Sequence, residues 1–297
     1  MKLKVMKHAK LFFIISSIVI LIGLGFIFIK GLNYGIDFRG GTIVNIELGR
    51  QFTTDEIRQI TDNYDKSADI TYSGDNKTQV VISTKEDLSD QQRKQMFEDF
   101  QEKYNLDASA LISIDKVSAT IGSEMAVQSM WAIIAVIIGI LIYVSIRFEF
   151  LFGFTAIVCL FHDVMIVISV YAIAQIQVNT PFIAAVLTIL GFSINDTIVV
   201  FDRIRENRKK YGKHDYTTLV DDSVSQTIRR SINTTATVLI AITTLYILGV
   251  AEIRDFALPL IIGFLGGTYS SICIASPLWA ILQERSDKKR KLKTARR

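Results

Sequence analysis

The chain of 297 residues is 50% hydrophobic and 21% charged, with a formal net charge of +4. Its apolar residues form long blocks, which is typical of a membrane protein and excludes a wholly soluble fold. Cys159 and Cys273 lie inside such blocks and the three histidines are scattered, so neither a disulfide framework nor a metal site is expected.

The first apolar block covers residues 11–29 and follows four lysines. A cleaved signal peptide is the alternative interpretation, but the apolar region of a signal is about 7–15 residues long and ends in small residues. This block is longer and leads into Lys30 and Gly31. We therefore interpret it as a retained first span.

Five further blocks approach the roughly 20 residues that cross a bilayer. The predicted spans are residues 11–29, 130–146, 151–174, 182–201, 234–250 and 257–282. Six spans place both ends of the chain on one side, and the positive-inside rule identifies that side as cytoplasmic. Residues 1–10, a basic loop at 202–233 and a basic tail at 283–297 are then cytoplasmic, and residues 30–129 lie outside.

The basic tail has two interpretations. Its lysines and arginines could form a nucleic-acid patch, but it contains no aromatic residue to stack on bases. A cationic stretch directly after a span instead indicates contact with anionic lipid headgroups. We therefore expect anionic lipids, and no nucleic acid, among the partners.

The external segment has the periodicity of an α+β domain. Alternating polarity between turn signals predicts strands at residues 42–48, 68–72, 79–83 and 111–117. Capping-box patterns predict helices at 53–64 and 89–104. The order β-α-β-β-α-β is the ferredoxin-like pattern. The predicted fold class is therefore a membrane all-α six-helix bundle with an inserted α+β ferredoxin-like external domain.

The external segment carries no nucleophile and base motif and no phosphate-binding loop, so we expect it to bind or move a partner and not to catalyse a reaction. Residues 35–42, just after the first span, contain three glycines. Because glycine reaches positive φ freely, we interpret this stretch as a tight turn that joins the span to the sheet.

Two spans contain ionisable residues. A charge in the middle of a bilayer costs on the order of 2.5–3.5 kcal/mol, so such residues are functional candidates. His162 and Asp163 lie near the centre of the third span, and we favour Asp163 of the two. Asn195 and Asp196 lie in the cytoplasmic half of the fourth span. Their alternative role is to hold helices together by hydrogen bonds.

Two spans also carry a stripe of small and polar residues on one helical face. The stripe is Thr188, Gly191 and Asn195 on the fourth span, and Arg230, Thr234, Thr237, Ala241 and Thr244 on the fifth. If the second stripe meets Asp196, a deprotonated carboxylate attracts Arg230 and protonation releases it, so the pair can act as a switch. The alternative is that Arg230 only reaches the headgroups as a topogenic charge.

Several of these segments resemble the SecF branch of the SecD/SecF family. The likeness rests on residues 35–42, on Phe161 to Val164, on the stretch 187–207 and on Arg229 to Ser231, in that order along a six-span chain. The resemblance implies that the chain pairs with SecD into a pseudosymmetric unit of the RND superfamily. This chain would supply half of the transmembrane domain.

The resemblance also implies the function. The complex would associate with the SecYEG channel and other Sec accessory proteins in the bacterial cytoplasmic (inner) membrane. It would use the proton-motive force, with no enzymatic activity and no bound cofactor, to promote translocation and release of preproteins on the outer side. The family's intramembrane carboxylate falls on Asp196 and its essential arginine on Arg230, and its proton path also needs an acidic residue on SecD.

Two other functions stay open on the residues alone. The chain could be an RND-like exporter of small solutes or lipids, which a deep apolar pocket or a tunnel would favour. It could instead be a non-transporting assembly scaffold, whose buried charges only hold helices together. A carboxylate with neighbouring hydroxyls also suits sodium ions as well as protons.

Overall fold

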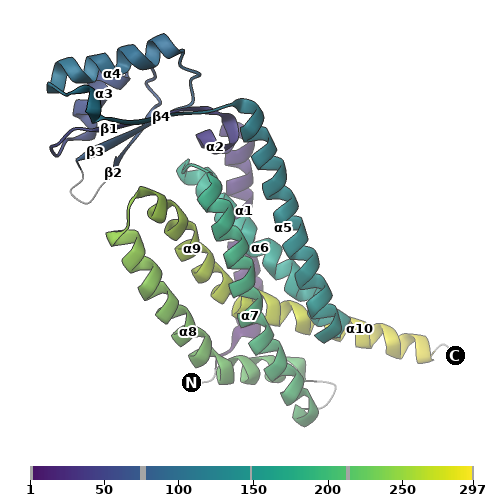
Figure 1. Cartoon of the computed structure of the whole chain (residues 1–297). Helices are drawn as coiled ribbons and strands as arrows, with labels where there is room; N and C mark the ends of the chain where they lie inside the picture. The colour runs from purple at the N-terminus through teal and green to yellow at the C-terminus, as the bar shows by residue number, and fades with distance from the viewer. Residues whose placement is uncertain (1–2, 74–77, 148, 212–214, 296–297) are drawn as a thin grey trace.

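The computed structural model describes residues 3–73, 78–147, 149–211 and 215–295. A bundle of long helices carries a small α+β domain at one end, and both ends of the chain lie at the other end (Figure 1). Six helices are long and apolar enough to cross a membrane. Together with the sheet of the small domain, this confirms the predicted fold class.

The helices run beyond the apolar blocks at several ends. They are α1 (Val5–Lys30), α5 (Ala119–Arg147), α6 (Phe150–Ala174), α7 (Thr180–Tyr211), α8 (Tyr216–Leu248) and α9 (Ala251–Ser270), which continues through the π-helical turn η2 (Ser271–Ala275) into α10 (Ser276–Ala295). The bilayer boundaries predicted for the spans stay a prediction.

The segment 202–233, predicted as a basic cytoplasmic loop between spans, is helical over most of its length, and its place relative to the membrane stays a prediction. Helix α7 continues to Tyr211, and α8 already begins at Tyr216. Two pairs at i,i+3, Arg203 with Glu206 and Arg205 with Asp202, bridge successive turns of α7. Charged side chains such as these favour helix, so leaving the apolar block does not end it. The basic tail likewise continues α10 as helix.

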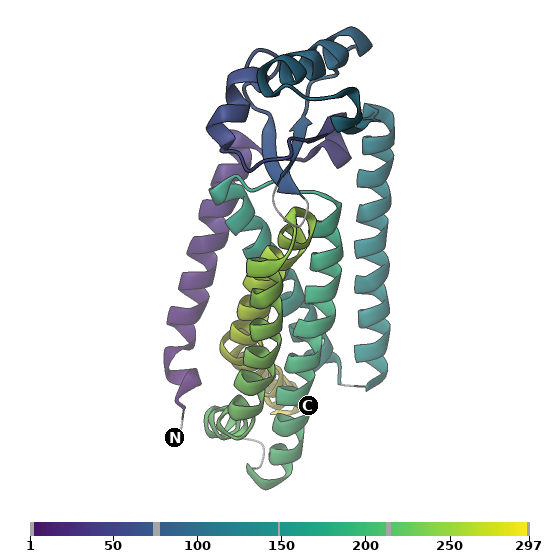
Figure 2. The ribbon, with the colours of Figure 1, turned by 60° about the vertical axis from the view of Figure 1, so that its left-hand side comes forward.

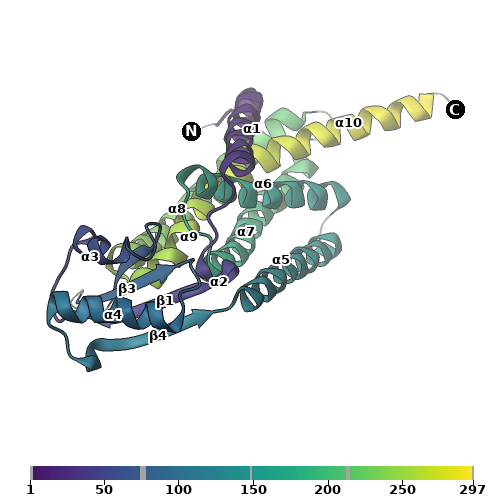
Figure 3. The ribbon, with the colours of Figure 1, turned by 90° about the horizontal axis from the view of Figure 1, so that it is seen from above.

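The α+β domain contains a four-stranded antiparallel sheet in the order β2-β3-β1-β4. Its elements are α2 (Ile36–Arg39), β1 (Gly41–Glu47), α3 (Thr54–Thr61), β2 (Asp69–Ser73), β3 (Gln79–Thr84), α4 (Asp90–Tyr104), η1 (Ala108–Ala110) and β4 (Leu111–Val117). Helices α3 and α4 cover one face of the sheet (Figures 1 and 3). The predicted turn between β2 and β3 falls largely on residues 74–77, outside the described residues.

Local signals position the two helices of this domain. Ser89 and Gln92 form a reciprocal capping box at the start of α4. At the start of α3, Thr53 accepts the backbone N–H of Glu56, while the Glu56 carboxylate contacts Arg50. The apolar faces of both helices then pack on the alternate residues of the strands, with Phe100 fully buried. Burying a side chain of this size contributes about 1.5–3 kcal/mol.

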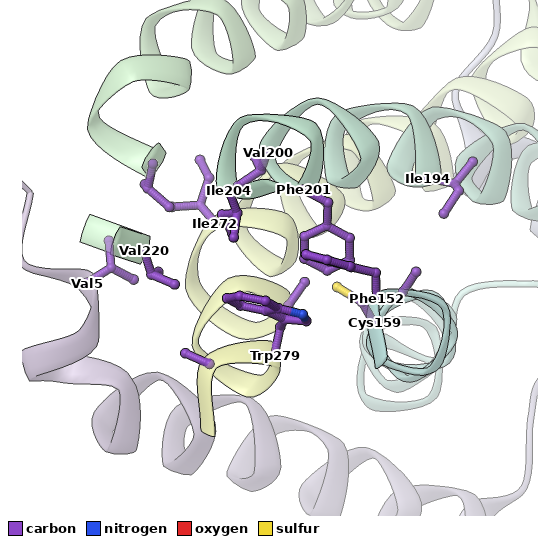
Figure 4. Close-up of a cluster of buried hydrophobic side chains, with 14 of the residues drawn as sticks. Val5, Phe152, Cys159, Ile194, Val200, Phe201, Ile204, Val220, Ile272 and Trp279 are labelled. Atoms are coloured by element: carbon purple, nitrogen blue, oxygen red, sulfur yellow. The ribbon is translucent and has the colours of Figure 1, made fainter. Parts of the chain in front are cut away.

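Aromatic rings from three helices pack together in the bundle (Figure 4). The ring of Phe152 on α6 stacks on Trp279 of α10 at 4.7 Å between centroids, and it packs against Phe201 of α7 at 5.0 Å. Helices α6, α7 and α9 are buried along about half of their apolar windows, whereas α1, α5 and α8 are largely exposed. In Figure 2, α1 and α5 stand on opposite sides of this centre.

Candidate functional site

Two carboxylates lie buried in the centre of the bundle. Asp163 on α6 is 1% exposed and Asp196 on α7 is 8% exposed. Both therefore face protein and not lipid, as the cost of a charge in hydrocarbon requires. Each one accepts a hydrogen bond from a serine on a neighbouring helix, so the two sites share a design but use different partners.

The carboxylate of Asp196 is held by α8. Ser231 Oγ donates to Asp196 Oδ1 at 2.6 Å. The other oxygen, Oδ2, is buried and has no hydrogen-bond partner among the described residues. Because an ionised carboxylate accepts at both oxygens, only half of its hydrogen-bonding capacity is used by this chain.

The structure does not bring Arg230 into contact with Asp196. In the described residues no ion pair within 4.0 Å joins them, and the Arg230 side chain is exposed. Thr234 is exposed too, one turn along the same face of α8. Ser231 lies about 100° round the helix from Arg230, and it is Ser231 that faces α7.

The polar stripe of the fifth span is therefore an outer face of this chain. All five of its residues are exposed: Arg230, Thr234, Thr237, Ala241 and Thr244. Thr237 and Thr244 donate to carbonyl oxygens of their own helix, at 2.7 and 2.8 Å. Such internal bonds let hydroxyls face an apolar surrounding at little cost.

The stripe of the fourth span also points outward. Thr188, Gly191 and Asn195 are exposed, and a Cβ atom added at Gly191 would have no neighbour within 4 Å. Helices α7 and α8 pack against each other. The two stripes thus flank the buried Asp196 on adjoining helices, but neither packs on this chain.

Asp163 and His162 contact each other, although adjacent positions on a helix diverge by about 100°. His162 Nδ1 lies 3.0 Å from Asp163 Oδ1, and Ser193 Oγ of α7 donates to Asp163 Oδ2. The second nitrogen of the ring, Nε2, is buried without a partner among the described residues. Asp163 thus has both oxygens occupied, unlike Asp196.

Two hydroxyl pairs join α7 and α8 to the helix that contains the π-helical turn. Thr197, next to Asp196, pairs with Ser271 of η2 at 2.8 Å, and Thr235 pairs with Thr268 at 2.6 Å. Sequence reasoning missed Ser193, Ser231 and this turn. A usable signal was present, since Ser193 and Thr197, like Ser231 and Thr235, stand at i and i+4 and so share a helical face.

The glycine-rich segment after α1 is a joint between the sheet and the bundle. Gly40 and Gly41 adopt positive φ, of 80° and 147°, and a Cβ on Gly41 would collide with the Thr84 carbonyl oxygen of β3. This confirms the predicted tight turn, to which the structure adds the short helix α2.

The same joint binds the start of α7. Gly35 N donates to Val178 O at 2.8 Å, and the N–H of Thr180 donates to Asp37 Oδ2 at 2.8 Å. The carboxylate of Asp37 therefore lies at the N-terminus of the helix that carries Asp196. Sixteen residues separate Thr180 from Asp196, or about 24 Å of helix.

Comparisons with known proteins agree on one family. Residues 96–285 match the family described as protein export membrane protein SecD/SecF, C-terminal, and residues 25–51 match the SecD/SecF GG motif. The SecF protein translocase subunit of Sebaldella termitidis is 40% identical over 95% of this chain and 92% of its own length. The SecDF subunit of Bacillus subtilis is 36% identical over 94% of this chain but only 38% of its own length.

Two solved structures are similar over nearly the whole chain. The crystal structure of SecDF from Thermus thermophilus, a translocon-associated membrane protein, matches with a TM-score of 0.82 at 33% identity, over 96% of this chain. A SecDF structure in the Super-membrane-facing form matches with a TM-score of 0.71 at 31% identity, over 99% of this chain. This chain spans 39% and 40% of those two chains.

Proposed function

The chain belongs to the SecD/SecF family of protein-export membrane proteins, and on this basis we propose that it couples proton movement past Asp196 to protein export. It is a multi-pass, non-enzymatic translocase subunit of the SecF type. Beyond family membership, we propose the energy source, the residues that bind the proton and the motion that proton binding causes. The single observation that carries it is the half-satisfied buried carboxylate of Asp196.

Asp196 is suited to bind and release a proton. It is buried, one oxygen is held by Ser231, and the other has no hydrogen-bond partner among the described residues. A purely structural carboxylate is expected to resemble Asp163, whose two oxygens both have partners. Asn195 and Thr234 lie on the exposed faces beside it and would line the path, with Arg230 as the charge that responds to the state of Asp196.

The partner that completes this site is proposed to be a SecD-type chain. The Bacillus subtilis relative joins SecD and SecF in one polypeptide, more than twice as long as the segment matched here. Exposed small and polar stripes on α7 and α8 are the kind of surface that lets membrane helices approach closely. An acidic residue from the partner would then meet Arg230 and Asn195 from outside.

Motion is proposed to pass through the joint at residues 35–42. Asp37 holds the first turn of α7, and Gly41 lies against β3, so the sheet and the carboxylate-bearing helix share one linkage. One of the two similar SecDF structures is described as a Super-membrane-facing form, which supports a family in which the parts are arranged in more than one way. We propose that both termini are cytoplasmic and that the sheet domain meets preproteins emerging from the SecYEG channel.

The test is export of a secretory precursor in cells whose only copy carries Asp196→Asn. Asparagine keeps the acceptor oxygen for Ser231 but does not ionise, so the fold and the assembly are expected to persist while export falls. Membrane level and co-purification with the SecD-type partner are measured in parallel.

Asp163→Asn is the matched control, since it makes the same change in a carboxylate whose hydrogen bonds are internal. Its effect is expected to be on stability and not on the dependence of export on the proton gradient. Normal export with Asp196→Asn would sink the proton-coupling role and leave family membership untouched. Loss of export with normal assembly would support it against the scaffold alternative.

One apolar pocket near the glycine-rich joint bears on the exporter alternative. An apolar pocket of about 280 Å³ lies between α2, α5, α6 and α7. The residues that line it include Phe38, Met130 and Phe182, and none comes from the described strands. It therefore opens between membrane helices and the short helix α2, and this pocket does not itself reach the described strands.

A further inference from the structure

A long apolar groove runs between α1, α8 and the last membrane helix. It has a volume of about 460 Å³, and residues from the start of the chain form part of its lining. Val5, Phe12, Ile232, Leu239 and Leu265 contribute to its walls. Nothing in the protein-export role uses this groove.

The few polar groups in its walls are already bonded within the protein. Thr235 pairs with Thr268 at 2.6 Å, and Tyr269 donates its hydroxyl to the carbonyl oxygen of Phe12 at 3.0 Å. The surface that an occupant meets is therefore hydrocarbon along its length. This chemistry fits an acyl chain.

The length of the groove matches one leaflet. On α8 its wall extends from Ile228 to Leu239, eleven residues or about 16 Å of helix. Half of a hydrocarbon core is about 15 Å thick. A wall of about 16 Å is comparable in length to a single lipid tail.

The rim of the groove carries basic side chains, which suit a site for an anionic lipid headgroup. Lys4, directly before α1, and His8, in its first turn, both line the groove and are exposed. The nearby Asp221 accepts the N–H of Met6 at 2.9 Å and so fixes the start of α1 beside α8. Basic residues at this depth attract anionic headgroups.

The groove lies on the opposite side of α8 from its polar stripe. Ile232 and Leu239 are turned about 200° and 180° from Arg230 round the helix, at 100° per residue. A chain that packs on the polar stripe therefore leaves the groove facing the bilayer. This geometry favours a lipid over a second protein helix.

We propose that the groove binds one acyl chain of an anionic phospholipid from the leaflet on the N-terminal side, with its headgroup against Lys4 and His8. The site is separate from the basic tail, which lies on α10. The lipid would hold α1 against α8, the helix whose Ser231 contacts Asp196.

The test uses the purified full chain, stripped of lipid and titrated with phosphatidylglycerol or with phosphatidylcholine of the same tails. Native mass spectrometry counts the lipid that stays bound. We expect one tightly retained phosphatidylglycerol, which Ala236→Trp removes because this exposed alanine lines the groove. Ala135→Trp, at an exposed alanine on α5 outside the groove, is expected to retain it.

A second pair of variants tests the headgroup. Lys4→Gln should weaken retention about fivefold, the equivalent of about 1 kcal/mol for one basic residue at a membrane surface. Lys7→Gln removes the same charge from a residue that is not part of the groove lining and should leave retention unchanged.

Equal retention by Ala236→Trp and Ala135→Trp would overturn the proposal. Equal retention of phosphatidylcholine would overturn it as well, because the rim would then not select charge. Release of the lipid when the SecD-type partner is added would show that a protein covers the groove and would likewise refute a lipid site.

Discussion

Gly263→Ala tests how closely α9 approaches the helix that carries Asp196. A Cβ atom at position 263 would lie within 3 Å of three side-chain carbons of Ile189 on α7, including Cγ2 at 2.9 Å. Overpacking of this kind costs about 1–3 kcal/mol. Alanine also gains about 1 kcal/mol over glycine within a helix, so the net loss of stability is expected to be small but measurable.

Gly191→Ala is the matched control, because the same methyl there meets no atom within 4 Å. It should keep the full helix-propensity gain of about 1 kcal/mol. The two substitutions are therefore expected to differ by about 1–3 kcal/mol, with Gly263→Ala the less stable. The readout is the midpoint of thermal unfolding of the full chain in detergent.

Ile189→Ala in the Gly263→Ala background identifies the clashing partner. It removes all three carbons that the new methyl would meet, so the double variant should be more stable than the sum of the single effects predicts, by about 0.5–3 kcal/mol. Additive effects, or a Gly263→Ala variant as stable as Gly191→Ala, would refute the close approach.

Three further predictions concern the sheet domain, each measured in the full chain by hydrogen exchange of β1 and β3, corrected for intrinsic rates. Burial alone would raise the pKa of Asp65, but hydrogen bonds from Thr84 and Ser67 outweigh it and hold the pKa below its usual value. The contribution of ionised Asp65 to the stability of the domain is complete above the unfolded-state pKa of about 4 and is lost as pH falls through the lower folded-state pKa. Asp65→Asn should therefore weaken protection at pH 7 by about 1–3 kcal/mol. It should also abolish the loss of protection at acid pH. Phe100→Ala should cost about 3–5 kcal/mol because the ring is fully buried, and unchanged exchange would contradict that burial. Gly41→Ala should cost about 1–3 kcal/mol, since φ is 147° and the methyl meets a backbone carbonyl; normal protection would mean that the turn adapts.

Local signals predicted the elements of the fold. The Ser89 capping box and the alternating residues of β1 act within a few residues of sequence, so their structure follows from short-range chemistry. The apolar blocks predicted six spans for the same reason. The continuation of α7 beyond the predicted span was missed. Hydropathy indicates where a chain leaves the lipid, whereas a helix ends at a cap or at a break in its backbone hydrogen bonding.

The rotation of each helix about its axis could not be predicted. Periodicity places Arg230 and Thr234 on one face of α8, and they do share a face, but it is exposed. Ser231, one residue away, is the group that reaches Asp196. A single sequence fixes angles within a helix, and only packing against other helices fixes which angle points inward.

The exposed polar stripes of α7 and α8 can be interpreted once the rotation of each helix about its axis is known. A helix that only needed to sit in lipid would gain nothing from an exposed arginine and asparagine, and would lose on insertion. Here Asn195 and Arg230 are exposed on either side of a buried carboxylate whose second oxygen has no partner among the described residues. Exposing these polar groups to lipid costs free energy, and that cost is avoided only if another membrane chain covers both stripes and contacts them. Under the proposed function, the site would be divided between this chain and a SecD-type partner, and protonation of Asp196 would act at the contact between them.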